Sequence, residues 1–423
     1  MQNQTEVVEV PQIKELEELV APHLNGSKIT SYTSKYLTKP GENYGSCMIA
    51  VTAKVETSDG KEESLEMVAK MPPLADFFFK IFCPERTFRT ENSIYLDLVP
   101  ALESIEKQLD IPTESSFVRI FPKSYGGRVN CNNDVGPVDR DALLVLENLV
   151  ISGFKPGTRS KFFGLEDCKF VLKNLAKFHA SSIVLRKLKP TEFQKIVNDN
   201  FKKFDMEGNM DDDYNNDFTE LVLSDIKKAT NNNEKVLKRY NEFTEISKAS
   251  NSDGIECEDG PYSAICHYDF WINNMMIKYD PITSTPIDIK IVDFQISQYN
   301  SAARDVFFFL FSSVEIEVLR NHYQDLLKVY FDSLVDLLQI YGCSTEEYNF
   351  DSFLKEVKDI APLEVPHAIF MLKVVMAEVK VENDDFSKLD ESMFMDENAN
   401  LVGLSYFKRI QDNFELLEKF GYL

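Results

Sequence analysis

Apolar and polar residues alternate along much of the first third of the chain, which is typical of half-buried β-strands. Three such stretches follow one another, at residues 29–38, 47–57 and 64–71. The turn Ser58-Asp59-Gly60 joins the last two. An amphipathic segment before them begins at Pro11 and ends at Asn25-Gly26, which predicts a short helix. The chain is therefore expected to open with a helix and an antiparallel sheet.

The pattern changes after about residue 150. Before that point we expect a helix over 87–109 and two further strands, at 117–121 and 142–146. Beyond it, residues 165–188 have helical periodicity, and His179 within them is expected to pack in the core. Short strands are predicted around 264–266, 275–279 and 287–292, an acidic loop at 206–217, and helix from 304 almost to the C-terminus. The predicted class is α+β with two lobes, residues 1–147 forming a sheet lobe with one helix and 148–423 a larger helical lobe.

Composition narrows the possible partners. The 423 residues carry 46 basic and 69 acidic side chains, a net charge of −23, which disfavours nucleic acid or an anionic membrane as partner. The seven cysteines are scattered without a CxxC pair, as expected of reduced thiols. The N-terminus lacks the features of a signal peptide. We therefore expect a cytoplasmic protein without an obligate protein partner.

One sequence motif in the second half of the chain is typical of a catalytic site. The sequence from His267 to Asn274, HYDFWINN, has the HxDxxxxN spelling of a kinase catalytic loop, and IVDFQ with Asp293 follows a predicted strand. Phosphoryl transfer needs a carboxylate at the acceptor hydroxyl, for which Asp269 is the candidate. It also needs oxygen ligands for Mg²⁺, for which Asn274 and Asp293 are candidates. GxxxxGK[ST], GxGxxG, HExxH and GxSxG are all absent.

The predicted sheet lobe has groups suited to the rest of an Mg·ATP site. Lys70 ends an alternating strand and Glu91 lies in the next helix, as expected of a phosphate-binding lysine and the glutamate that holds it. Glu147 and Leu149, in LLVLENL, lie where backbone groups would contact an adenine edge. A glycine-bearing turn between two strands offers backbone amides to phosphates, through residues Gly41, Asn43, Tyr44, Gly45 and Ser46.

As an ordered set, these motifs resemble the ecdysteroid kinase-like (CHK-kinase-like) family, which is related to choline and aminoglycoside kinases. The resemblance rests on GENYGS, VAKMP, FRTENSIY, LVLENL, LAKFHA, CHYDFWINNMM, IVDFQ and ARDVF. It implies a protein kinase-like fold with Asp269 as base and with Asp305 bracing the catalytic loop, and it implies the ATP and Mg²⁺ roles given above. Tyr268 departs from the family, which usually has glycine there, and Gly45 stands where members often carry alanine.

The expected function is an ATP- and Mg²⁺-dependent kinase that phosphorylates a hydroxyl group of a small molecule. The resemblance suggests an ecdysteroid, and a xenobiotic alcohol or phenol is a close second. The acceptor is expected to bind in the helical lobe, over the catalytic loop. A choline- or aminoglycoside-type kinase is one alternative, since an acidic protein attracts cations. A nucleotide-binding pseudokinase scaffold is the other, and Tyr268 is the residue that motivates it.

Overall fold

The computed structural model describes residues 10–38, 45–132, 136–158, 161–201, 212–252, 259–376, 378–379 and 400–423. The described residues form two compact units. The first draws on Met1–Leu96, Pro122–Ser152 and Glu378–Leu401. The second draws on Asp97–Phe121, Gly153–Ala377 and Val402–Leu423.

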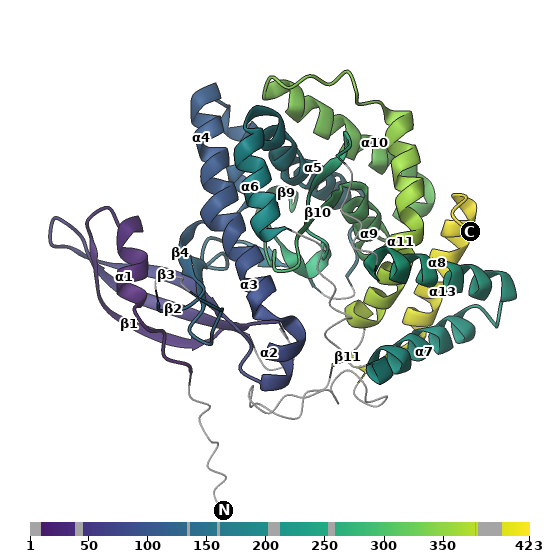
Figure 1. Cartoon of the computed structure of the whole chain (residues 1–423), viewed down its shortest axis with the longest axis horizontal. Helices are drawn as coiled ribbons and strands as arrows, with labels where there is room; N and C mark the ends of the chain where they lie inside the picture. The colour runs from purple at the N-terminus through teal and green to yellow at the C-terminus, as the bar shows by residue number, and fades with distance from the viewer. Residues whose placement is uncertain are drawn as a thin grey trace, which may run out of the picture. The chain divides into compact units, whose positions relative to one another are not determined.

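A five-stranded antiparallel sheet is the centre of the first unit (Figure 1). The strands are β1 (Lys28–Tyr36), β2 (Cys47–Glu56), β3 (Glu62–Met71), β4 (Ser124–Arg128) and β5 (Leu143–Glu147). The strand order is β1-β2-β3-β5-β4, and all of the strands except β4 lie where strands were predicted. Alternate residues of β2 are buried, because successive side chains of a strand point to opposite faces of the sheet. These side chains pack with Leu16 and Val20 of α1 (Leu16–Val20), so this short helix covers one face of the sheet.

Two helices follow the sheet's first three strands, α2 (Asp76–Phe82) and α3 (Pro84–Ser93). The helix predicted over 87–109 is confirmed, but it is not uniform. A π-helical turn, Ile94–Leu98, separates α3 from α4 (Val99–Leu109), which belongs to the second unit. Such turns insert an extra residue into a helix and are frequent at functional sites.

The strand predicted at 117–121 is wrong, because these residues form the 3₁₀ turn Val118–Ile120. Here these side chains pack against distant parts of the chain and do not form a strand. Phe117 stacks on Tyr341, with ring centroids 4.0 Å apart. Glu106 accepts backbone hydrogen bonds from Phe117 and Val118, at 2.6 and 3.2 Å. Contacts with distant segments therefore override the local β-propensity.

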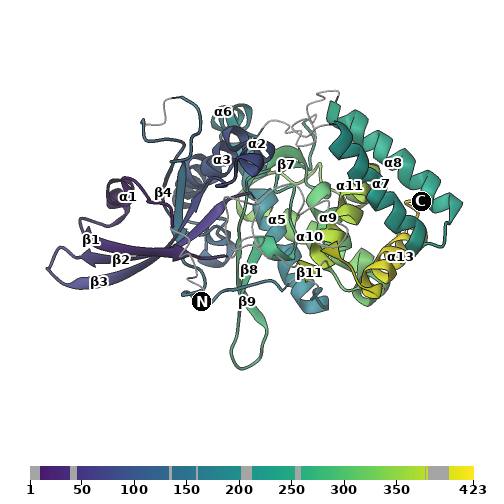
Figure 2. The ribbon, with the colours of Figure 1, turned by 90° about the horizontal axis from the view of Figure 1, so that it is seen from below.

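The second unit is mostly helical, as predicted. Its helices beyond α4 are α5 (Leu165–Leu188), α6 (Pro190–Asn200), α7 (Asp212–Ala229), α8 (Glu234–Ser252), α9 (Ala303–Ser313), α10 (Ile316–Ile340), α11 (Phe350–Met376) and α13 (Leu404–Lys419). Every residue of α9 is buried, and α11 packs against it. Figure 2 shows α7 beside α8 and α13.

The acidic loop predicted at 206–217 is wrong where the structure describes it, since α7 begins at Asp212. Residues 202–211 lie outside the described residues. Acidic residues in the first turn of a helix interact favourably with its dipole, so an acidic run is compatible with a helix start as well as with a loop.

Short strands interrupt the helices. They are β6 (Lys155–Pro156), β7 (Ser263–Cys266), β8 (Met275–Tyr279), β9 (Pro286–Ile291) and β10 (Gln298–Ser301). Three of them (β7, β8 and β9) lie at the predicted places, and two (β6 and β10) lie at places that were not predicted. β7 pairs with β10, and β8 lies between β6 and β9. The helix expected from 304 onwards is interrupted by two-residue strands of the first unit, β11 (Glu378–Val379) and β12 (Asn400–Leu401). Among the described helices, none has the length and hydrophobicity needed to cross a membrane.

Candidate active site

Lys70 and Glu91 form a buried ion pair in the first unit. Lys70 lies on β3, with its backbone paired to Met48 of β2 and Leu144 of β5. Its Nζ is 2.5 Å from Oε2 of Glu91 on α3, and each side chain is only 4% exposed. The sequence therefore identified two residues that the fold brings together.

A close helix–strand approach holds the glutamate in place. Asn92, next to Glu91, donates from Nδ2 to the carbonyl oxygen of Arg128 on β4, at 3.3 Å. A Cβ on Gly127 would lie 2.6 Å from Oδ1 of Asn92, well inside van der Waals contact. A side chain at Gly127 would therefore displace the Asn92 amide from this position.

The remaining nucleotide-site candidates of the first unit lie around strand ends. Gly45 and Ser46 immediately precede β2 and are buried, and Gly41, Asn43 and Tyr44 lie outside the described residues. Glu147 ends β5, where its backbone N–H donates to Lys123 and its carboxylate accepts from the Lys123 N–H, both at 2.9 Å. The Glu147 N–H is thus already engaged. Leu149, two residues on, is 5% exposed.

Asp269 and Asn274 meet in the second unit, in the loop between β7 and β8. Nδ2 of Asn274 donates to the backbone oxygen and to Oδ2 of Asp269, both at 2.8 Å. This fixes the orientation of the Asn274 amide, because its nitrogen faces Asp269 and its oxygen points elsewhere. An amide oxygen with that orientation is a suitable ligand for a hard cation such as Mg²⁺.

His267 ties this loop to the segment that carries Asp293. Its Nε2 donates to the carbonyl oxygen of Val292 at 2.9 Å, and its Nδ1 accepts from the Asp269 N–H at 3.3 Å. Val292 in turn donates from its N–H to the Asn274 carbonyl at 3.0 Å. The imidazole is thus neutral with its proton on Nε2. Asp293, the next residue, has φ 67°, a left-handed conformation that is uncommon for a residue with a side chain.

Asp305, at the start of α9, holds the loop by hydrogen bonds to its backbone. Its Oδ2 accepts the N–H of His267 at 2.6 Å, and its Oδ1 accepts the N–H of Tyr268 at 2.9 Å. Nε2 of His179 is also 3.0 Å from Oδ2, and its Nδ1 is 2.7 Å from the hydroxyl of Tyr330. The carboxylate is 1% exposed, so these bonds replace the water that a buried charge loses.

His179 was expected only to pack in the core. It is fully buried, and it also supports Asp305. With Cys266, these two residues form a cluster whose ligand-type atoms lie within 4.8 Å of one another. The Asp305 oxygens already accept three hydrogen bonds, and the Cys266 thiol faces the carbonyl oxygens of Asn300 and Ser301, each at 3.3 Å. This cluster is therefore a hydrogen-bonded support for the loop.

Tyr268 has a backbone conformation that favours glycine, with φ 66°. This is a physical reason for the glycine that the family resemblance leads us to expect at this position. Its side chain packs against Arg304 of α9, whose guanidinium lies 4.8 Å from the ring centroid. Nη1 of Arg304 also donates to the Tyr268 hydroxyl at 3.0 Å. These contacts offset the cost of the left-handed conformation.

Some surroundings of Asp269 raise the pKa of its carboxyl and others lower it, and the net effect is a rise. Burial raises the pKa of its carboxyl above the ordinary value, and the negative charge of Asp293 raises it further. Electrostatic interactions with His267 and with His367 and the hydrogen bond from Asn274 oppose that rise. Asp269 thus combines two properties of a proton acceptor, partial desolvation and a fixed orientation.

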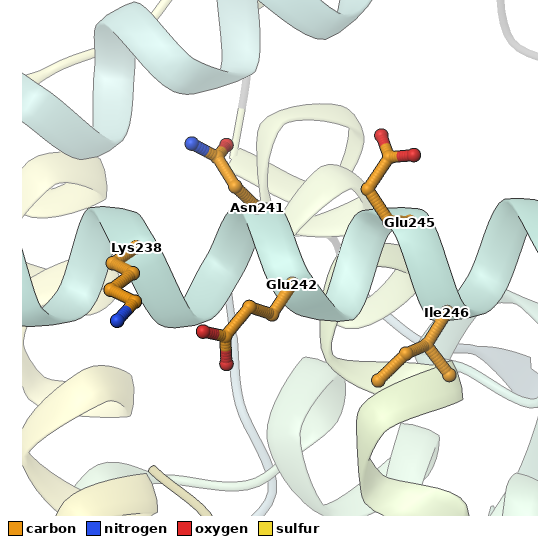
Figure 3. A pocket seen from close by; sticks show the side chains of 5 residues that line it. All are labelled: Lys238, Asn241, Glu242, Glu245 and Ile246. Atoms are coloured by element: carbon orange, nitrogen blue, oxygen red, sulfur yellow. The ribbon is translucent and has the colours of Figure 1, made fainter.

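A surface hollow in the same unit lies elsewhere. It is bounded by side chains of α8, namely Lys238, Asn241, Glu242, Glu245 and Ile246 (Figure 3). These side chains come from successive turns of one helix and point in different directions (Figure 3). None of them belongs to the catalytic loop or to the segments bonded to it. We therefore do not assign the acceptor to this hollow.

The sequence model of the ecdysteroid kinase-like family matches residues 40–343, which include both the lysine pair and the candidate catalytic loop. The chain belongs to the ecdysteroid kinase-like family. It is therefore a small-molecule kinase by type, with the identity of the acceptor left open.

Solved structures with overall similarity include a choline/ethanolamine kinase family protein from Mesorhizobium loti. It has 10% sequence identity and a TM-score of 0.34, and the match covers 91% of this chain and 90% of that one. An aminoglycoside kinase of the APH(2″) type, in complex with GDP and kanamycin, has 11% identity, a TM-score of 0.37 and 93% coverage of each chain. Similarity at this level carries no information on individual residues. No curated protein sequence matches the chain.

Proposed function

We propose that this protein is an ATP- and Mg²⁺-dependent kinase that phosphorylates a hydroxyl group of an ecdysteroid or of a similar hydroxylated steroid or xenobiotic. The observation that carries the proposal is the catalytic loop. In it, one amide group of Asn274 binds Asp269 in two places, and Asp305 holds the backbone immediately before the base. A carboxylate held this firmly suits positioning of a nucleophile.

In the proposed reaction, Asp269 orients the acceptor hydroxyl and takes its proton. The hydroxyl oxygen forms a bond to the γ-phosphorus while the bond from that phosphorus to the β,γ-bridging oxygen breaks, so that ADP leaves with the electron pair. The raised pKa of Asp269 makes it a better proton acceptor than an exposed aspartate.

Oxygen donors for the metal come from Asn274 and Asp293. The amide of Asn274 turns its nitrogen to Asp269, which leaves Oδ1 for a cation, and Asp293 adds a carboxylate. Hard oxygen ligands of this kind fit Mg²⁺. Bound there, the metal would neutralise charge on the ATP phosphates.

Nucleotide contacts are assigned to the first unit. Lys70, held by Glu91, would bind phosphate oxygens, and the turn containing Gly45 and Ser46 would donate backbone amides to them. Since the Glu147 N–H is already engaged, we assign an adenine contact to its carbonyl oxygen and a second one to the N–H of Leu149.

Product analysis tests this function. The purified protein is incubated with Mg²⁺ and either ATP or GTP, and with ecdysone, phenol, choline or kanamycin as acceptor. Mass spectrometry then identifies any phosphate ester. We expect an ester on the steroid or the phenol, and none when EDTA removes the metal. An ester on choline or kanamycin alone would contradict the acceptor class. Binding of Mg·ATP without any product would favour a scaffold.

A further inference from the structure

A chain of buried polar contacts leads from the catalytic loop to α11. It begins at Tyr268, whose hydroxyl accepts a hydrogen bond from Nη1 of Arg304 at 3.0 Å. Nε of Arg304 donates in turn to Oε1 of Glu364, at 2.5 Å. Arg304 and Glu364 are 8% and 3% exposed, so the pair is shielded from water. The residue beside the base is thereby linked to a helix distant in sequence.

His367 ends this chain of contacts. Its Nδ1 is 3.2 Å from Oε2 of Glu364, and its ring stacks on Phe308 of α9 with centroids 4.2 Å apart and planes 6° apart. Although burial raises the pKa of Glu364, the charge of Arg304 and the hydrogen bond and charge of His367 lower it to about 2. Glu364 is thus a carboxylate, which only accepts hydrogen bonds, so Nδ1 of His367 carries a proton and donates it.

The other edge of the His367 ring is accessible. The side chain is 30% exposed, and no hydrogen bond from the described residues reaches Nε2. Through Glu364 and Arg304, the imidazole is connected to Tyr268, the residue beside the proposed base. In a neutral imidazole whose proton is on Nδ1, Nε2 presents a lone pair that accepts a hydrogen bond.

We propose that His367 is a substrate-contact residue whose Nε2 accepts a hydrogen bond from a second hydroxyl of the acceptor molecule. This inference rests on the proposed kinase function. The reacting hydroxyl gives its proton to Asp269, so it has none left to donate to His367. If the acceptor molecule donates to Nε2, the donor is therefore another of its groups. The site would thus prefer an acceptor that carries a hydroxyl beside the one that is phosphorylated.

Two substitutions separate this contact from a packing role. His367→Asn retains a donor at the position of Nδ1, for Glu364, but has no atom at the position of Nε2. His367→Gln places an oxygen acceptor near the position of Nε2. Thermal shift with Mg·ATP checks that each variant is folded and binds nucleotide.

The kinetic experiment uses ecdysone, catechol and phenol as probes, with catechol and phenol forming a pair that differs by one adjacent hydroxyl. Loss of one hydrogen bond in the site should raise the KM for ecdysone or catechol about tenfold in His367→Asn. We expect the KM for ATP and kcat to change less than threefold, the KM for phenol to stay unchanged, and His367→Gln to restore most of the affinity.

Three other results overturn the inference. If the wild type phosphorylates a probe and His367→Asn has the same KM for ecdysone and catechol, the contact does not exist and the kinase function stands. The same holds if phenol loses as much affinity as catechol, because His367 would then act without a second hydroxyl. If the wild type transfers phosphate to none of the probes, the proposed function fails and this inference fails with it.

Discussion

The lysine pair of the first unit and the catalytic loop of the second position charged groups in different ways. Lys70 is 2.5 Å from one opposite charge, Glu91, and both are almost completely buried. Asp269 has no ion-pair partner among the described residues, and its position follows from hydrogen bonds through Asn274, His267 and Asp305. Charge pairing therefore holds the lysine, whereas backbone and amide contacts hold the aspartate.

The difference suits the two proposed roles. A lysine that binds phosphates has to remain charged in a buried place, which a neighbouring carboxylate favours. A base has to accept a proton, and a cation paired with it would make that harder. We therefore expect changes at the lysine pair to affect stability and activity together, and changes in the loop to separate the two.

The largest effect is expected from breaking the lysine pair. Lys70→Met leaves Glu91 as a buried charge without its lysine, which should lower the free energy of unfolding by about 3–5 kcal/mol. It should also lower kcat/KM for ATP at least a hundredfold, because phosphate binding is lost. Urea unfolding and steady-state kinetics measure the two effects.

A double variant separates stability from function at this pair. Lys70→Met with Glu91→Leu removes both charges, so stability should recover while activity stays low. As a control, Lys54→Met breaks the exposed pair with Glu62 on the same sheet and should leave the urea midpoint unchanged. A double variant with full activity would refute the role of Lys70.

The next largest effect is expected at Asp305. In Asp305→Ala, the N–H groups of His267 and Tyr268 and the ring of His179 lose their buried acceptor. Two or three unsatisfied donors should cost about 3 kcal/mol or more. Asp305→Asn keeps one oxygen acceptor and should be destabilised less, as measured by urea unfolding. Equal stability of Asp305→Ala and the wild type would contradict the support that we assign to this residue.

Lowering the pH should remove the contribution of the Arg304–Glu364 pair to the stability of the fold. The pKa of Glu364 in the folded protein is about 2, below its ordinary value of 4.5. A folded-state pKa that is lowered means that ionised Glu364 stabilises the fold above about pH 4.5 and that this contribution is lost as the pH falls towards 2. Glu364→Gln should therefore flatten the loss of stability over that range, whereas Glu347→Gln, at a half-exposed position, should not. Unfolding by urea at several pH values measures the slopes.

The smallest effect is expected at Tyr268. Tyr268→Gly removes the cost of a left-handed residue, about 1 kcal/mol, and also the contacts with Arg304, so the two changes nearly cancel. We expect kcat to change less than threefold. An inactive wild type that becomes active in Tyr268→Gly would show that the tyrosine blocks catalysis, as the scaffold hypothesis holds.

Local sequence was sufficient for the parts of the molecule in which structure follows from nearby residues. The alternating strands and the helix at 165–188 were predicted in this way, and so was the proximity of Asp269 to Asn274, five positions apart. The strand predicted at 117–121 failed, because Glu106 and Tyr341 decide that conformation from elsewhere in the chain.

The resemblance implied that Asp305 braces the loop, but the residues that bond to Asp305 and Arg304 could not be predicted, for the same reason. His179 meets Asp305 across 126 positions, and Arg304 meets Glu364 across 60. No spacing rule links such residues before the fold is known. A buried histidine in LAKFHA was a usable signal for a core position, but it did not specify the carboxylate that the histidine binds.

The most direct test of the central claim compares phosphate transfer by the wild type and by Asp269→Asn at saturating Mg·ATP. Asparagine keeps the size of the side chain and an oxygen for Asn274, but it does not accept the acceptor's proton. We predict that kcat falls about a thousandfold while the Kd for Mg·ATP, measured by calorimetry, stays within about twofold. A variant whose kcat remained within tenfold of the wild-type value would contradict the assignment of Asp269 as the base.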